Sequence, residues 1–204
     1  MKKLYLIVIF LLTAMSVSAQ HNHNHSADNT LNTTEVNSEH SLYHLDAEWT
    51  DHRNETISLT DFKGAPVIVV MFYGNCTEVC PILIQDAWRL YSSVDESVQE
   101  EINVLAVSFD TENDTPEVLR KYAEYEQLDI PGWYFMTTDD ADIRTLAMML
   151  GVQYSKKSDG HFAHSNLVTV LDEKGRIAQR VEGLNQPMDD AKSKIESIMA
   201  KLNK

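Results

Sequence analysis

Residues 67–73 read VIVVMFY, and residues 74–81 continue as GNCTEVCP. The first stretch is a continuous apolar run rich in β-branched side chains, which is typical of a strand buried on both faces of a sheet. The second stretch places Cys76 and Cys80 just past the carboxyl end of that strand. In an open α/β sheet, ligands and reactive groups gather at this edge. The two cysteines are therefore predicted to lie at a functional site.

Helices and strands are predicted to alternate around this stretch. Further strands are expected at Tyr43–Trp49, Thr56–Leu59, Ile102–Phe109, Trp133–Met136, Leu167–Leu171 and Ile177–Val181. Helices are expected at Ile84–Val94, after Thr115-Pro116-Glu117, at Ile143–Leu150 and at Ala191–Leu202, where apolar side chains recur every three or four residues. This order predicts an α/β fold, a thioredoxin-like sheet with an N-terminal hairpin and a strand-helix insertion.

The composition excludes several classes of protein. The chain has 204 residues, 43% of them hydrophobic, which suits one globular domain. Seventeen basic against 31 acidic residues give a net charge of −14, so the chain lacks the basic footprint of a nucleic-acid-binding protein. Only two cysteines are present, which excludes a multi-disulfide scaffold and an all-cysteine metal site within one chain.

The N-terminus resembles a secretory signal. Lys2 and Lys3 precede an apolar run at Leu4–Met15, and small residues lead up to Ala19. The run is about a dozen residues, shorter than the ~20 that span a bilayer, although an uncleaved membrane anchor is the alternative. We expect residues 1–19 to be removed on export, so that the protein works in the periplasm or elsewhere outside the cytoplasm.

A polar leader separates the signal from the folded domain. Residues 20–41 contain too few apolar side chains to form a core, so a disordered His/Asn-rich segment is expected. Its histidines either capture metal ions weakly or belong to a solubilising linker; they are His21, His23, His25 and His40. The folded domain is expected to occupy residues 42–204.

The spacing of the two cysteines suits redox or metal chemistry. Residues at i and i+4 share one face of a helix, so Cys76 and Cys80 can direct both sulfurs at one spot. The positive end of the helix dipole favours thiolates there. Two thiolates bind a soft ion such as Cu(I) or close a disulfide. A purely structural disulfide is the alternative, but so small a loop gives only a modest entropic gain.

A histidine is the expected third ligand. His164 lies just before Leu167–Leu171, a strand that neighbours the first one in a thioredoxin-like sheet, so it is expected to face the cysteine loop. His161 is a competing ligand with a weaker placement. His44 and His52 fall in the N-terminal hairpin and are expected to be ordinary surface groups.

Three groups of motifs carry a family resemblance. They are Asp61-Phe62-Lys63-Gly64, Pro66-Val67, Phe72-Tyr73, Cys76 and Val79-Cys80-Pro81; Val107-Ser108-Phe109-Asp110 and Asp114-Thr115-Pro116-Glu117; and His164-Ser165 before a strand ending in Asp172-Glu173-Lys174-Gly175. From Leu42 onward the chain resembles the Sco/SenC family. Members of that family are exported or anchored thioredoxin-like proteins that bind copper through two cysteines and a histidine. They help assemble the dinuclear copper (CuA) site of cytochrome c oxidase as copper donors, as thiol reductants, or as both.

The resemblance implies a ligand set and a partner. Cys76, Cys80 and His164 correspond to the copper ligands, for Cu(I) or Cu(II). Asp110 matches an acid near the family's site, where it is expected either to tune the metal from outside the ligand set or only to cap the following turn. The implied partner is cytochrome c oxidase subunit II or another exported copper protein.

Two other functions use the same sulfurs. In a thiol–disulfide reductase, Cys76 and Cys80 would be the redox-active pair. Such enzymes resemble thioredoxin in using C-x2-C with a proline before a core strand, whereas here the spacing is one longer and no proline lies between Pro131 and Pro187. A peroxidase of the peroxiredoxin type needs P-x3-T-x2-C. Position 73 is tyrosine rather than proline, so copper handling is favoured over both alternatives.

Overall fold

The structure is a computed structural model that describes residues 40–204. The predicted signal segment and nearly all of the predicted leader lie outside the described residues. The first described element is η1 (Leu42–His44), a single 3-10 turn. It begins at Ser41, whose side-chain oxygen accepts a hydrogen bond from the backbone N–H of Tyr43.

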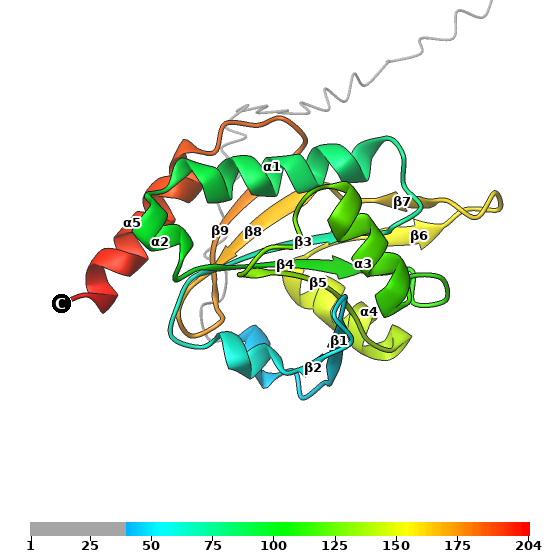
Figure 1. Cartoon of the computed structure of the whole chain (residues 1–204), viewed down its shortest axis with the longest axis horizontal. Coiled ribbons are helices and arrows are strands. Elements are labelled where there is room, and N and C mark those ends of the chain that lie inside the picture. The colour runs from blue at the N-terminus through cyan, green and yellow to red at the C-terminus, as the bar shows by residue number, and fades with distance from the viewer. Residues whose placement is uncertain (1–39) are drawn as a thin grey trace, which may run out of the picture. The chain divides into compact units, whose positions relative to one another are not determined.

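A mixed sheet of seven strands organises the described part of the chain, in the order β2-β1-β5-β4-β3-β8-β9 (Figure 1). Strand β3 (Val67–Phe72) lies at its centre, parallel to β4 (Asn103–Ser108) and antiparallel to β8 (Leu167–Leu171). The remaining strands are β5 (Trp133–Thr137), β1 (Trp49–Asp51), β2 (Thr56–Ile57) and β9 (Ile177–Glu182). A separate two-stranded sheet pairs β6 (Tyr154–Lys156) with β7 (Phe162–His164).

Helices cover both faces of the large sheet. They are α1 (Val79–Ser93), α2 (Glu96–Gln99), α3 (Pro116–Tyr125), α4 (Asp140–Leu150) and α5 (Asp189–Leu202), and a 3-10 turn, η2 (Leu59–Phe62), follows β2. In Figure 1, α1 and α3 lie on one face and α4 on the other. None of the helices within residues 40–204 has both the length and the apolar character needed to cross a bilayer.

Helix boundaries follow local capping chemistry. Thr115 accepts the backbone N–H of Val118 at the start of α3, and Asp139 accepts that of Asp142 at the start of α4. Helix α4 ends at Gly151, whose φ of 76° lies in the left-handed region that glycine adopts without steric cost. Both helices thus begin at a residue whose side-chain oxygen caps a backbone N–H, and α4 ends at a glycine.

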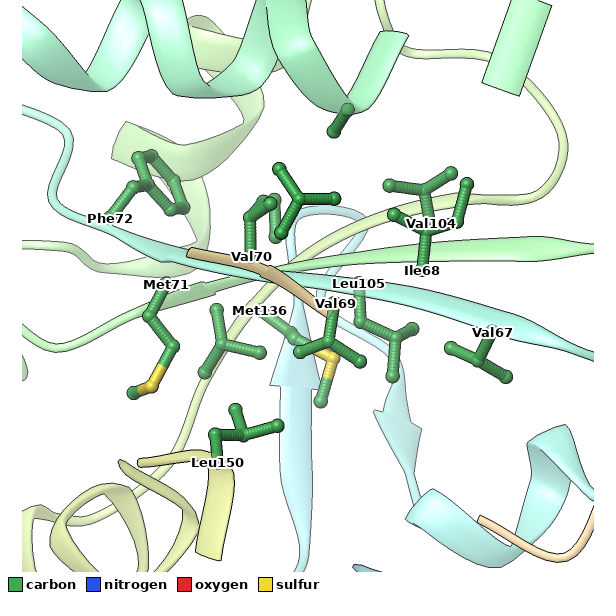
Figure 2. Close-up of a cluster of buried hydrophobic side chains, with 14 of the residues drawn as sticks. Val67, Ile68, Val69, Val70, Met71, Phe72, Val104, Leu105, Met136 and Leu150 are labelled. Atoms are coloured by element: carbon green, nitrogen blue, oxygen red, sulfur yellow. The ribbon is translucent and has the colours of Figure 1, made fainter. Parts of the chain in front are cut away.

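The core is built on β3, in which all six residues are buried. Figure 2 shows why the run has no polar member: Val70 and Phe72 point toward α1, whereas Val69 and Met71 point to the opposite face. Leu150 of α4 lies on that second face. A strand covered on both sides must be apolar at consecutive positions, and this fixes β3 as the centre of the fold.

The α/β thioredoxin-like architecture predicted from the sequence is confirmed, but its first segment differs. Residues 43–44 belong to a 3-10 turn instead of a strand, and only the end of Tyr43–Trp49 enters the sheet. The Tyr43 hydroxyl donates to the carbonyl oxygen of Phe62 at 2.9 Å, and its ring lies against Gly175, where a Cβ atom would come within 2.6 Å of it. Tertiary contacts thus bury this aromatic residue without sheet pairing.

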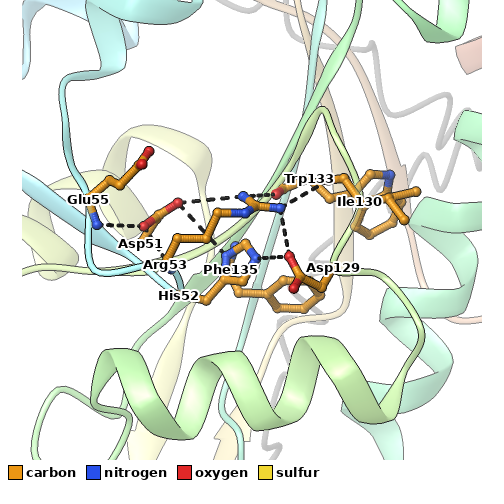
Figure 3. Close-up of polar contacts among 8 residues, drawn as sticks. All are labelled: Asp51, His52, Arg53, Glu55, Asp129, Ile130, Trp133 and Phe135. Atoms are coloured by element: carbon orange, nitrogen blue, oxygen red, sulfur yellow. Dashed lines mark hydrogen bonds and ion pairs between the residues drawn. The ribbon is translucent and has the colours of Figure 1, made fainter.

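The prediction that His52 is a surface group is wrong. The residue is only 1% exposed, in the network shown in Figure 3. The backbone N–H of Phe135 donates to Nδ1 at 3.2 Å, and Nε2 lies 3.1 Å from Oδ1 of Asp129. Arg53 binds the same carboxylate oxygen at 2.8 Å. His52 is buried because both ring nitrogens find partners on distant segments. His44, by contrast, is exposed as expected.

Candidate metal centre

Three side chains that the sequence singles out come together at one end of the sheet. Cys76 lies in the loop after β3, Cys80 in the first turn of α1, and His164 at the end of β7. One ligand atom from each residue lies within 4.8 Å of the other two. Both cysteines are free thiols.

The Cys76 sulfur lies against the N-terminus of α1. The residue before that helix, Glu78, makes no side-chain capping hydrogen bond. Instead, the Cys76 sulfur accepts the backbone N–H of Cys80 at 3.3 Å. Burial raises the pKa of the Cys76 thiol, but hydrogen bonds from Cys80 and from the amides of Glu78 and Val79 outweigh that effect and leave the pKa below its ordinary value. Cys76 is therefore the sulfur that ionises more readily.

Cys80 has the opposite environment. It has no exposed surface, and burial is the main reason that its pKa lies well above the ordinary thiol value. The charge of the neighbouring Cys76 raises the pKa further. Its sulfur lies 3.5 Å from Nε2 of His164. The centre thus pairs a readily ionised sulfur with one that stays protonated until it binds a metal or forms a disulfide.

His164 presents a defined nitrogen to the sulfurs. Its Nδ1 lies 3.0 Å from the carbonyl oxygen of Ser165. Because a carbonyl oxygen only accepts, Nδ1 carries the proton, and Nε2 directs its lone pair toward Cys80. The rings of Tyr73 and Phe109 flank the imidazole, with centroids 6.1 and 5.3 Å away. Such a backbone contact orients a metal-ligating histidine and sets its tautomer.

A cavity of about 490 Å³ opens onto the centre. Both Cys76 and His164 line it. His161 lines it too, and its Nδ1 lies 3.2 Å from the Tyr73 hydroxyl, but it is outside the three-residue group. The structure therefore places the competing histidine beside the candidate ligand set and not within it.

Asp110 lies at the end of β4, as the sequence suggests, but it faces elsewhere. Its two carboxylate oxygens both accept hydrogen bonds from the side-chain amide of Asn113, each at 2.9 Å. It also lines a different cavity, of about 580 Å³, with Phe109 and Tyr154. These contacts are those of a residue that closes a turn, and its influence on a metal stays a prediction.

The carboxylate that contacts the cysteine loop is Asp114. It is buried and accepts hydrogen bonds from the backbone N–H of Gly74 at 2.7 Å and from the hydroxyl of Ser108. Burial raises its pKa, although these two donors oppose the shift. The sequence shows Asp114 only as part of a helix-opening motif. The residue type that could have pointed to this contact is the glycine at position 74, because a Cβ atom there would come within 2.8 Å of the Asp114 carboxylate.

The donor set defines what the centre can bind. Two sulfurs and one imidazole nitrogen around one point suit a soft ion in a trigonal site, and Cu(I) is such an ion. The same sulfurs can instead join in a disulfide. The fold and the site together define a class of protein: a thioredoxin-like domain with a dithiol–imidazole centre beyond the carboxyl end of its central strand.

The comparisons with known proteins narrow this class to a family. The model of the SCO1/SenC family matches residues 36–200. The chain therefore belongs to the SCO1/SenC family, as its motifs suggest. It is 24% identical over 147 residues to the SCO1 protein homolog of Bacillus subtilis, which covers 70% of this chain and 76% of that protein.

Solved structures agree with the fold. Bradyrhizobium japonicum ScoI, determined with copper bound, matches with a TM-score of 0.59 and 22% identity, over 74% of this chain and 96% of that one. BsSco, described as a member of the Sco family of cytochrome c oxidase assembly proteins with a disulfide switch, matches with a TM-score of 0.65 and 23% identity, over 75% and 91%.

Proposed function

We propose that this chain is an exported copper chaperone that holds copper through Cys76, Cys80 and His164. One observation carries the proposal: a backbone carbonyl fixes the histidine tautomer so that Nε2 faces a pair of free thiols within 4.8 Å. The copper-bound relative ScoI supports the choice of metal. Copper is the cargo here, and the protein supplies the ligands and their geometry.

The asymmetry of the two thiols suggests an order of binding. Cys76 has the lowered pKa and lines the cavity, so its sulfur meets the ion first. The buried Cys80 sulfur then binds the metal and releases its proton to solvent, and Nε2 of His164 completes the set without losing a proton. The contact of Asp114 with Gly74 keeps the loop in place while these ligands engage.

The proposed destination is the CuA site of cytochrome c oxidase. The family's link to oxidase assembly supports this partner, with subunit II or another exported copper protein as the recipient. The signal-like residues 1–19 support export, with residues 20–41 as a leader and 42–204 as the copper-binding domain. Reduction of a client disulfide by Cys76 and Cys80 is the alternative use of the same centre.

A single substitution separates copper delivery from thiol reduction. His164→Ala removes the nitrogen ligand and leaves both thiols, so we expect a loss of Cu(I) affinity of about 100-fold or more with little change in disulfide reduction. The measurements are a Cu(I) titration against a competing chelator and a disulfide-reduction assay on the same preparations. His44→Ala, at an exposed histidine, is the matched control.

The same measurements can also contradict copper delivery. If His164→Ala binds Cu(I) as tightly as the wild type, and the wild type binds no more tightly than a simple dithiol, copper delivery is wrong. Near-normal reduction of a client disulfide by the same variant, lost only when Cys76 or Cys80 is changed, would then favour the reductase.

A further inference from the structure

A second imidazole lines the cavity that leads to the centre. His161 precedes β7 and is exposed, whereas His164 at the end of the same strand is half-buried. Both histidines line the cavity of about 490 Å³ together with Cys76. Because His161 lies outside the group within 4.8 Å, an ion on it and an ion in the three-residue centre occupy different positions.

Hydrogen bonding fixes which nitrogen of His161 is free. The Tyr73 hydroxyl has one proton and lies 3.2 Å from Nδ1 of His161. Nδ1 is therefore the ring nitrogen that the fold engages, whereas Nε2 has no hydrogen-bond partner within the described residues and is the nitrogen left for a ligand.

The surroundings of His161 favour a cation. Two carboxylates, those of Glu78 and Asp159, line the cavity against the single ammonium group of Lys157. Asp159 also accepts the backbone N–H of His161 at 3.0 Å, which fixes the turn that carries the imidazole. A cleft with an excess of negative charge raises the local concentration of cations.

We propose that Nε2 of His161 is a transit ligand, which holds copper at the mouth of the cavity before the ion passes to Cys76 and on its way out. This inference rests on the proposed copper-binding function. The transfer is a ligand exchange in which copper stays Cu(I). The bond to Nε2 breaks as the bond to the Cys76 sulfur forms, and any proton on that sulfur leaves to solvent.

The kinetics of copper uptake test this proposal. The full chain is mixed anaerobically with the Cu(I)–bicinchoninate complex, and the loss of its colour is followed by stopped flow. We expect His161→Ala to slow uptake several-fold while the equilibrium Cu(I) affinity stays within about twofold of the wild type, because the three final ligands remain. His44→Ala, an exposed histidine beside a different cavity, is the matched control and should leave the rate unchanged.

A second variant separates ligation from positioning. In His161→Asn, the side-chain amide replaces Nδ1 as the hydrogen-bond partner of Tyr73 but supplies no nitrogen lone pair for copper. A transit ligand requires this variant to be as slow as His161→Ala. Wild-type uptake rates in His161→Asn or in His161→Ala would overturn the proposal and leave the copper centre intact. Absence of Cu(I) binding by the wild type would instead overturn the proposed function itself.

Discussion

Two histidines are held in this fold in opposite ways. Toward one edge of the sheet, both ring nitrogens of His52 have partners in the fold: Nδ1 accepts the backbone N–H of Phe135, and Nε2 contacts Asp129 (Figure 3). At the end of β7, only Nδ1 of His164 binds a backbone group, the carbonyl oxygen of Ser165, and Nε2 faces the sulfur of Cys80. Burial does not distinguish a structural imidazole from a candidate ligand, because His52 is the more buried of the two. The difference lies in the second ring nitrogen, which contacts a carboxylate in His52 and faces a thiol in His164.

The largest effect should come from copper itself, and it should depend on one histidine only. A free Cu(I) concentration about 1,000 times Kd stabilises the wild type by about 4 kcal/mol. At the same concentration, a 100-fold weaker His164→Ala should gain only about 1.4 kcal/mol, whereas His52→Ala should keep the full increment. Thermal unfolding in a Cu(I) buffer measures both. Equal increments in the two variants would break the comparison.

The metal-free protein should show the reverse pattern. His52→Ala leaves the buried N–H of Phe135 without an acceptor and removes a partner of Asp129, so we expect the free energy of unfolding to fall by about 3 kcal/mol. The exposed His44→Ala should change it by less than about 0.5 kcal/mol. Urea unfolding measures the difference. A cost for His52→Ala no greater than for His44→Ala would show that its two contacts contribute nothing.

Substitutions of Asp114 and Asp110 test which of these two carboxylates supports the cysteine loop. Asp114→Ala strands the backbone N–H of Gly74 and the hydroxyl of Ser108, and should cost about 2 kcal/mol of stability and weaken Cu(I) binding. Asp110→Ala frees only the amide of Asn113 and should cost less in both measurements. Asp114→Asn retains one acceptor and should fall between them. Identical losses for both alanine variants would mean that Asp114 does not hold the cysteine loop.

The smallest effect is a pH dependence at the His52 end. The hydrogen bond from His52 is the main cause that holds the pKa of Asp129 below its ordinary value, with Arg53 adding to it. A carboxyl with a lower pKa when folded stabilises the fold above its unfolded pKa, about 3.9, and loses this contribution as pH falls through the folded pKa. Asp129→Asn should therefore flatten the acid limb of the stability curve slightly. An unchanged acid limb would show that this carboxylate is screened.

The sequence predicts those parts of the fold whose signals are local. The unbroken apolar run of β3 identifies the central strand, and the hydroxyl–proline pair at Thr115 marks the start of α3. Cys76 and Cys80 follow β3 directly, so their place at the end of the sheet needs only the strand and the helix after it. Position along the chain is enough to predict these features, because each depends on neighbours within one or two turns.

The features that sequence analysis missed depend on distant partners. His52 lies in a polar hairpin, and the groups that bury it come from Asp129 and Phe135, 77 and 83 residues away. Each strand of the β6–β7 hairpin has only three residues, so no alternation reveals the hairpin, yet it places His164 beside the thiols. Asp114 shows a capping motif in the sequence, whereas its contact with Gly74 spans 40 residues.

The most direct test of the central claim is X-ray absorption at the copper edge of the Cu(I)-loaded protein, for the wild type and for His164→Ala. The account predicts two sulfurs and one imidazole nitrogen around copper in the wild type, and loss of the nitrogen with both sulfurs retained in the variant. A wild-type spectrum without sulfur, or a nitrogen signal that survives in His164→Ala, would contradict the assignment of Cys76, Cys80 and His164 as the copper ligands.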